Sequence, residues 1–263
     1  MSGGELHGRH AIVTGGGRGI GAAISRELAR LGAAVTIMGR NPATLDARTR
    51  ALRDELGPPT RVQAITCDVT DEGSVREAFA AAAADLGAAY VLVNNAGDAE
   101  AALVHEMSLD TWEATLAVNL TGTFLCSREV LPDMLAAGEG RIVNIASTAA
   151  FEGFKRMAAY CAAKHGVLGL TRALAAETAR AGVTVNAVCP GYTADTDMTR
   201  RAVAGLVAAG RTEEAALSML AGANPQGRLV RPEEIARMVA WLCSTETSEV
   251  TGRSIVVGGG DVP

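Results

Sequence analysis

The feature that most constrains the fold of this chain is a regular alternation between short apolar segments and longer helical ones. From His10 onward, short runs of β-branched or apolar residues alternate with longer Ala- and Leu-rich segments of helical period. This alternation is typical of βαβ units, in which right-handed crossovers place helices on both faces of a parallel sheet. Seven strands are predicted, over residues 10–14, 34–38, 61–66, 90–93, 141–145, 183–188 and 254–257.

The chain has 263 residues, of which 48% are hydrophobic, so it is long enough to bury a substantial core. It contains no internal repeat and no low-complexity linker, and we therefore expect one domain over residues 1–263. Three helix starts carry capping signals, at Asn41, Thr70 and Ser108. In an α/β sheet of this kind ligands bind beyond the carboxyl ends of the strands, so functional residues are expected just after each strand.

Composition argues against several classes of protein. No apolar stretch approaches the length needed to span a bilayer, and residues 1–10 do not resemble a secretory signal, so a soluble cytoplasmic protein is expected. The net charge of −5 and the absence of Lys/Arg runs disfavour nucleic acid as a partner. Scattered cysteines without a CxxC pair predict reduced, mostly buried thiols, neither a disulfide framework nor a metal site: Cys67, Cys126, Cys161, Cys189 and Cys243.

A glycine-rich turn joins the first strand to the first helix. Gly15, Gly19 and Gly21 give the pattern GxxxGxG, and Arg18 and Ile20 lie within it. Such a turn lets backbone N–H groups and the helix dipole approach a pyrophosphate closely. Taken alone, it could equally be a tight connection between a strand and a helix. Its position after the first strand of an α/β pattern favours a dinucleotide site.

The end of the second strand bears on which dinucleotide would bind. NAD-binding folds often carry an acidic residue there for the ribose 2′-hydroxyl, whereas a nearby arginine accommodates a 2′-phosphate. This chain lacks the acid and has Arg40, and Arg18 could add a second positive charge. The alternative is that both arginines are solvated surface residues. We therefore predict a preference for NADP(H), with NAD(H) still possible.

Two residues that could exchange a proton lie on one predicted helix, over residues 157–181. Tyr160 and Lys164 are four residues apart and so project from the same helical face. An ammonium beside a phenol is expected to lower the phenol pKa from about 10, which suits an acid/base group. Ser147 follows the fifth strand and could hydrogen-bond a carbonyl oxygen. An isolated Tyr–Lys pair would more often be packing plus a solvated charge, so the argument depends on all these features together.

With these motifs in place, the chain closely resembles the short-chain dehydrogenase/reductase family over nearly its whole length. Besides the glycine turn, Ser147, Tyr160 and Lys164, the motifs occur in the family's order: Asp68-Val69 after the third strand, Asn94-Asn95-Ala96-Gly97 after the fourth, Asn119 in the next helix, and Pro190-Gly191 after the sixth. The resemblance implies a single Rossmann-type doubly wound domain and an NAD(P)-dependent oxidoreductase.

The resemblance also implies roles for these residues. Asn119, Ser147, Tyr160 and Lys164 would form a catalytic tetrad, in which Tyr160 handles the hydroxyl proton and Lys164 also binds the nicotinamide ribose. The implied cofactor contacts are Gly15, Arg18, Gly19, Ile20, Gly21, Arg40, Asp68, Val69, Asn95, Ala96, Gly97, Tyr160, Lys164, Pro190, Gly191 and Thr193. Family members usually form dimers or tetramers, so a homo-oligomer, a tetramer by preference, is expected.

The chain departs from the family pattern at two places. The segment after Pro190 looks one residue longer than in many relatives, so the hydroxyl that contacts the carboxamide could belong to Thr193 or Thr196. Residues 258–260 are three glycines where many relatives have Asp-Gly-Gly, which would alter a subunit contact or a loop.

A substrate lid is expected over residues 192–228, an Ala/Gly-rich segment that carries Met198, Leu206, Met219 and Leu220. Its apolar residues could equally be ordinary helix packing. The chain most resembles bacterial members that act on 3-oxoacyl or 3-hydroxyacyl thioesters carried by coenzyme A or acyl-carrier protein. Dehydrogenation of a small or cyclic secondary alcohol is the alternative. A catalytically silent, cofactor-sensing regulator is a hypothesis of another class, against which the intact Ser147, Tyr160 and Lys164 weigh.

Overall fold

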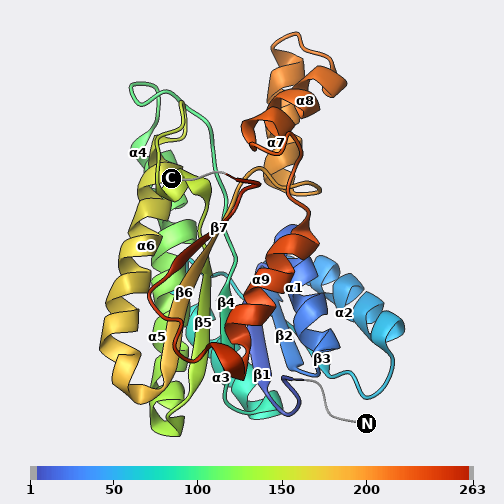
Figure 1. Ribbon diagram of the computed structural model, residues 1–263, viewed down its shortest axis with the longest axis vertical. Coiled ribbons are helices and arrows are strands. Elements are labelled where there is room, and N and C mark those ends of the chain that lie inside the picture. The colour runs from blue at the N-terminus through green and yellow to red at the C-terminus, as the bar shows by residue number, and fades with distance from the viewer. Residues whose placement is uncertain (1–4, 261–263) are drawn as a thin grey trace.

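The computed structural model describes residues 5–260, and within this range seven parallel strands form one sheet in the order β3-β2-β1-β4-β5-β6-β7 (Figure 1). The predicted seven-stranded parallel sheet is confirmed. The strands are β1 His10–Thr14, β2 Ala34–Gly39, β3 Val62–Thr66, β4 Val91–Asn94, β5 Gly140–Ile145, β6 Val183–Pro190 and β7 Ser254–Val257. Residues 1–4 of the segment considered as a secretory signal, and residues 261–263 of the predicted domain, lie outside the described range.

Helices connect the strands and cover both faces of the sheet. The α-helices of residues 5–260 are α1 Gly19–Arg30, α2 Pro42–Leu56, α3 Glu72–Leu86, α4 Leu109–Leu116, α5 Gly122–Ala137, α6 Ala158–Thr178, α7 Asp197–Ala208, α8 Glu213–Ala223 and α9 Pro232–Cys243. A π-helical turn, Ala117–Thr121, joins α4 to α5, and short 3₁₀ turns follow β5, α6 and α9. No helix in this range is both long and apolar enough to cross a membrane.

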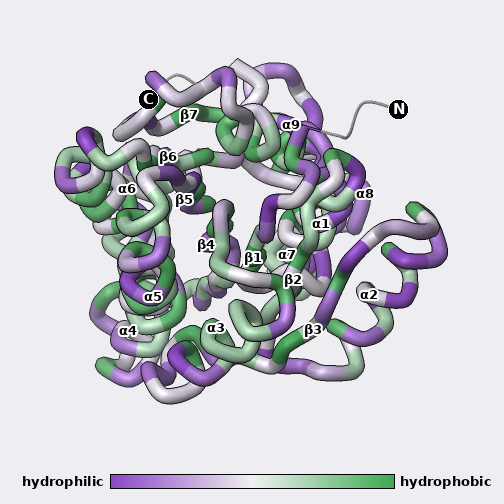
Figure 2. Tube along the Cα trace, turned by 90° about the horizontal axis from the view of Figure 1, so that it is seen from below, coloured by the Kyte–Doolittle hydropathy of each residue, from purple (hydrophilic) through white to green (hydrophobic). Residues whose placement is uncertain are grey.

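Two hydrophobic layers hold these helices against the sheet. On one face α1, α2 and α9 bury side chains such as Leu28, Leu52 and Ile235 against the strands. On the other face α3, α5 and α6 contribute to a second layer, which includes Phe79 and Leu125. Figure 2 shows the strands running between these two sets of helices. All five cysteines are buried and unpaired, as expected for reduced thiols.

The strand order places a crevice at the centre of one sheet edge. The chain runs outward from β1 to β3 and then returns to β4 on the other side of β1. Connections that leave β1 and β4 in opposite directions open a crevice between them at their carboxyl ends. The helices α7 and α8 stand beyond this edge, apart from the two layers (Figure 1).

The predicted strand boundaries coincide with those of the structure or differ from them by one or two residues, and one predicted cap is wrong. Asn41 and Ser108 cap α2 and α4 as expected, accepting hydrogen bonds from Thr44 N (3.0 Å) and Thr111 N (3.1 Å). The cap of α3 is Asp71, whose side chain accepts from the backbone N–H of Ser74. Thr70 instead donates its N–H and its hydroxyl to Asp68 Oδ1, and these bonds hold it outside the helix.

The predicted lid folds into α7 and α8 and packs largely on itself. Leu206 and Leu220 lie in a small cluster between the two helices, whereas Met198 packs beside Tyr160 and Met219 is exposed. The three C-terminal glycines contact the base of this segment, where Gln226 N donates to Gly259 O (3.0 Å). Gly259 and Gly260 both have positive φ, a backbone conformation that favours glycine.

Candidate active site

A cavity of about 700 Å³ occupies the crevice at the carboxyl edge of the sheet. It extends from the glycine turn to Ser147 and Tyr160, and the first turn of α7 lines it as well. The structure brings all the sequence-predicted site residues to this cavity except Gly21. A cavity at the point where the strand order reverses is the usual ligand site of such sheets.

The glycine turn depends on close contacts that only glycine allows. Gly15 has a φ of +63°, and a Cβ at Gly21 would lie 2.3 Å from the carbonyl oxygen of Gly15. Asn95 ties the turn to β4, since its Nδ2 donates to Thr14 O (3.0 Å) and Gly15 O (3.1 Å). Gly21 therefore packs α1 against the turn and does not itself line the cavity. The N-terminus of α1 is left open to an anion.

Charged residues at the adenosine end lie where the sequence suggested. Arg40 follows β2 and lines the cavity, as does Asp68 after β3. Partial burial raises the pKa of Asp68, but hydrogen bonds from Thr70 and the charge of Arg40 outweigh it, so the pKa is lowered overall. Asp68 is therefore ionised at neutral pH.

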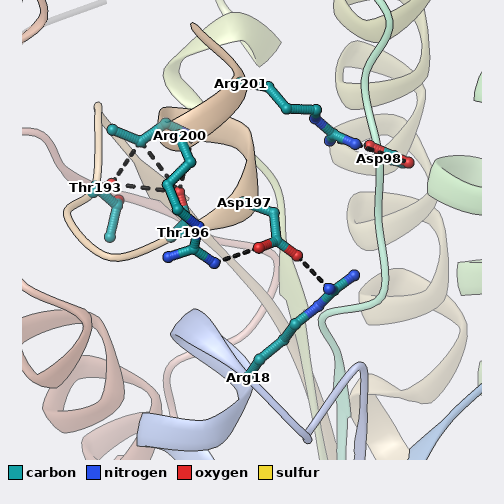
Figure 3. Close-up of polar contacts among 8 residues, drawn as sticks. Arg18, Asp98, Thr193, Thr196, Asp197, Arg200 and Arg201 are labelled. Atoms are coloured by element: carbon teal, nitrogen blue, oxygen red, sulfur yellow. Dashed lines mark hydrogen bonds and ion pairs between the residues drawn. The ribbon is translucent and has the colours of Figure 1, made fainter. Parts of the chain in front are cut away.

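Arg18 has a partner that the sequence did not predict. It forms an ion pair with Asp197 at the start of α7, and Asp197 also pairs with Arg200 (Figure 3). The second positive charge predicted for the adenosine end is therefore paired with α7 in this structure. The pair connects the N-terminus of α1 to that of α7.

Tyr160 and Lys164 lie on the inner side of α6, with only 7% and 5% of their surfaces exposed. Lys164 Nζ donates to the carbonyl oxygen of Ile145 (2.9 Å) and lies 5.5 Å from the centre of the Tyr160 ring. Ser147 follows β5, and its hydroxyl accepts from Ala149 N (3.2 Å). The end of β5 and one face of α6 thus bring the three predicted side chains to one end of the cavity.

Burial controls the protonation of this pair. Burial raises the pKa of Tyr160 to about 12, although a hydrogen bond with Ser147 acts to lower it. It lowers the pKa of Lys164 to about 8. The expectation that Lys164 would lower the Tyr160 pKa is therefore wrong for this arrangement. Both groups are removed from water, and the ammonium donates to a backbone carbonyl.

Asn119 lies in the π-helical turn between α4 and α5 and is fully buried. Its Nδ2 donates to Asp98 O (2.6 Å) and Thr115 O (2.9 Å), whereas its Oδ1 has no partner among the described residues. A single π turn inserted between α-helices is a frequent feature of functional sites. The helical period of the sequence contained no signal for it.

Thr193 and Thr196 both line the cavity, in the segment just before α7. The hydroxyl of Thr193 donates to Gly191 O (2.9 Å). The hydroxyl of Thr196 accepts from Thr199 N (3.1 Å) and so caps α7. Thr196 therefore has a structural role at the start of α7.

Several cavity residues were not singled out from the sequence. Phe154 and Met157, from the loop before α6, pack with Met198 beside Tyr160 and form apolar walls. Asp98 and Arg201 form an ion pair at the same end of the cavity (Figure 3). Asp98 directly follows Gly97 of the recognised motif, a position that could have drawn attention to it. The loop and lid residues carried no comparable signal.

Comparison with known proteins agrees with this geometry. Residues 9–206 match the family model described as short chain dehydrogenase. A cis-4-hydroxycyclohexanecarboxylate dehydrogenase of Sinomonas cyclohexanicum is 44% identical over 96% of this chain and 96% of its own length. A putative ketoacyl reductase of the granaticin polyketide synthase of Streptomyces violaceoruber is 40% identical, over 95% of this chain and 92% of its own.

Among solved structures, an actinorhodin polyketide ketoreductase variant with NADPH superimposes with a TM-score of 0.91. It is 37% identical to this chain, and the match covers 96% of both.

Proposed function

The chain belongs to the short-chain dehydrogenase family and is thus an oxidoreductase, and from that premise we propose that it reduces the ketone of a 3-oxoacyl thioester with NADPH. The observation that carries the proposal is the meeting of Ser147, Tyr160 and Lys164 at one end of a cavity whose other end is the glycine turn. The granaticin relative, named as a ketoacyl reductase, supports this substrate class.

The residues around the cavity fit a nicotinamide dinucleotide. Its volume lies within the roughly 300–1,000 Å³ typical of such sites. The N-terminus of α1 and the glycine turn would hold the pyrophosphate, Asp68 and Val69 would contact the adenine, and residues 95–97 would line the middle of the site. Lys164 would hold the nicotinamide ribose, and Thr193 would contact the carboxamide, because Thr196 caps α7.

In the proposed reaction, a nicotinamide bound in this cavity would supply the hydride that the ketone carbon receives. Tyr160 donates its phenolic proton to the ketone oxygen, and the Ser147 hydroxyl hydrogen-bonds the same oxygen. A Tyr160 pKa of about 12 keeps the phenol protonated at neutral pH, which suits the proton donor of a reduction. Lys164 returns a proton to Tyr160 from its buried ammonium, and Asn119, which lies on the same side of Gly97 as Lys164, extends the proton relay from Lys164.

The proposed preference for NADPH rests on Arg40. This guanidinium lies at the end of β2 and lines the cavity, with no acidic residue at the same strand end to bind a free 2′-hydroxyl. The ketoreductase that matches this chain in structure was solved with NADPH, which agrees with the proposal. Arg18 contributes only once it leaves Asp197.

A cyclic secondary alcohol is a second candidate substrate. The apolar walls formed by Phe154, Met157 and Met198 suit a compact hydrocarbon ring. The Sinomonas relative is named for a substituted cyclohexanol, and it is 44% identical to this chain.

We also propose that the chain forms a single domain with a lid over residues 192–228, and that it assembles as a homotetramer in the cytoplasm. The exposed apolar side chains of Leu109, Phe124 and Leu135 on α4 and α5 support a subunit contact. Light scattering of the purified protein would measure its mass in solution, and a monomer would contradict this part of the proposal.

The central experiment measures NADPH and NADH binding and then reduction of acetoacetyl-CoA and of 4-oxocyclohexanecarboxylate. Wild type is compared with Tyr160→Phe, which removes the proton donor and retains the ring. We expect turnover with NADPH in wild type and nearly complete loss in Tyr160→Phe, at unchanged cofactor affinity.

The outcomes separate the hypotheses. Reduction of the cyclic ketone alone would replace the thioester by the second candidate. Tight NADPH binding without reduction of any ketone would favour the cofactor-sensing regulator.

A further inference from the structure

The substrate end of the cavity combines apolar walls with one charged pair. Phe154, Met157 and Met198 pack around Tyr160, and this surface has no charge of its own. Asp98, from the loop after β4, and Arg201, from α7, face each other across this end of the cavity and form an ion pair (Figure 3). The ion pair is therefore the charged feature of an otherwise apolar part of the cavity, where it could contribute to the choice of substrate.

The pair is exposed enough to exchange partners. The side chains of Arg201 and Asp98 are 55% and 46% exposed. Ion pairs this open to water contribute little to stability, so a ligand can compete for either partner at low cost. The pair therefore contributes little to the stability of the fold. Because both residues line the cavity, we consider a role in ligand binding instead.

Asp98 and Arg201 differ in how many of their hydrogen-bonding groups remain free to bind a ligand. Asp98 Oδ1 already accepts from Ala99 N (2.8 Å) and from Arg201, and its backbone carbonyl accepts from Asn119. Two of the five N–H donors of Arg201 point to Asp98, and the other three bond no residue of the described chain. The unused capacity is thus on the cation, which favours an anionic ligand.

We propose that Arg201 is a specificity-determining residue that binds a carboxylate carried by the substrate. The planar guanidinium matches a carboxylate with two parallel hydrogen bonds. The substrate places its apolar part between Phe154 and Met198 and its ketone beside Tyr160. This inference rests on the proposed reaction at the same site and adds the charge of the preferred substrate.

The first test uses binding, so that it does not depend on turnover. Cyclohexanecarboxylate and cyclohexanecarboxamide have nearly the same shape and differ in charge. Each is titrated calorimetrically into the protein saturated with NADP⁺. We expect the carboxylate to bind on the order of 10- to 100-fold more tightly, the range for a hydrogen bond to a charged group.

Three variants assign the preference to Arg201. Arg201→Gln should remove the difference between the two ligands, and Arg201→Lys, which keeps the charge without the planar fork, should retain part of it. Arg200→Gln is the matched control, because the adjacent Arg200 pairs with Asp197 and not with Asp98. It should leave the preference intact. Equal binding of both ligands by wild type, or a preference that survives in Arg201→Gln, would overturn the inference.

Turnover of 4-oxocyclohexanecarboxylate, its carboxamide and acetoacetyl-CoA then separates this inference from the proposed function. If acetoacetyl-CoA or the neutral ketone is reduced but the carboxylate has no advantage in kcat/KM, the inference fails and the proposed function stands. If the carboxylate preference appears in binding and none of the ketones is reduced, the proposed function fails and Arg201 remains the anion-binding residue.

Discussion

At the scale of single residues, the site depends on how far each side chain is removed from water. Tyr160 and Lys164 are almost completely buried on α6, and burial disfavours the charged form of each. Arg40, Arg18 and Arg201 line the open parts of the cavity and remain available to ligands or to exchangeable ion pairs. The buried residues would therefore handle protons, and the exposed ones would bind anions.

The lowered pKa of Lys164 predicts a pH dependence of ketone reduction. Lys164 is charged below its pKa of about 8 and can return a proton to Tyr160, whereas above that pH it becomes neutral. We expect kcat/KM to be level near pH 6 to 7 and to fall above about pH 8. A pH profile checks this, with Lys164→Met as the control whose residual activity should lack the fall. A wild-type profile that rises above pH 8 would contradict it.

The same shift also affects stability. The folded-state pKa of about 8 is below the ordinary value of 10.5, so the unfolded chain holds this proton more tightly. Lys164 therefore destabilises the folded state below about pH 8, and its penalty is relieved as the pH rises from about 8 to 10.5.

Arg40 should decide the choice of cofactor. Arg40→Ala removes a charge-assisted contact to a 2′-phosphate, so we expect KM for NADPH to rise on the order of 10- to 100-fold. KM for NADH should change little. Steady-state kinetics with both cofactors measures this, with Arg50→Ala, an exposed arginine farther along α2, as the control. An unchanged ratio of the two KM values would exclude Arg40 as the determinant.

At the scale of elements, the glycine turn and α1 form one unit. Gly21 lets the first turn of α1 approach the carbonyl of Gly15, and Asn95 fastens the same carbonyl to β4. The N-terminus of α1 is thereby held at the mouth of the crevice, where its N–H groups and dipole favour an anion. A change in this packing would therefore move the N-terminus of α1 together with the glycine turn.

Two alanine substitutions test this unit. In Gly21→Ala the new Cβ would meet the Gly15 oxygen at 2.3 Å, so the turn must shift. We expect a loss of about 1–3 kcal/mol in the free energy of unfolding and weaker NADPH binding. The matched change Gly169→Ala, in an open part of α6, should instead add up to about 1 kcal/mol. Denaturant unfolding and cofactor titration measure both. Equal effects of the two substitutions would contradict the packing argument.

At the scale of the whole molecule, the cavity joins segments from both halves of the sheet. The glycine turn and the loop after β2 line it from one side, and β5, α6 and α7 line it from the other. The Arg18–Asp197 and Arg201–Asp98 ion pairs connect α7 to each side. A ligand in the crevice therefore contacts most of the fold at once and should stabilise it as a unit.

Cofactor binding should consequently raise the melting temperature. NADPH at about 100 times its Kd contributes about 2.7 kcal/mol, which corresponds to a shift of roughly 5 °C for a chain of this length. Differential scanning fluorimetry measures the shift, and NADH at the same concentration should give a smaller one. Equal shifts with the two cofactors would argue against the proposed selectivity.

The sequence by itself determined the features that depend on neighbouring residues. The alternation of apolar periods determined the seven strands and their connecting helices, and the spacing of glycines located the turn at α1. Asn41 and Ser108 could be identified as caps because each bonds an N–H three residues away. Tyr160 and Lys164 share a face because of the helical period alone. These features follow from local geometry, which does not depend on the rest of the molecule.

Only the tertiary structure decided what depends on distant segments. Arg201 and Asp98 are separated by 103 positions, and Arg18 meets Asp197 only because α7 folds back over the glycine turn. The same holds for the Tyr160 pKa, because burial is produced by the surrounding elements and outweighs the local chemistry of a Tyr–Lys pair. Contacts between remote segments and the exclusion of water are properties of packing, and no short stretch of sequence encodes them.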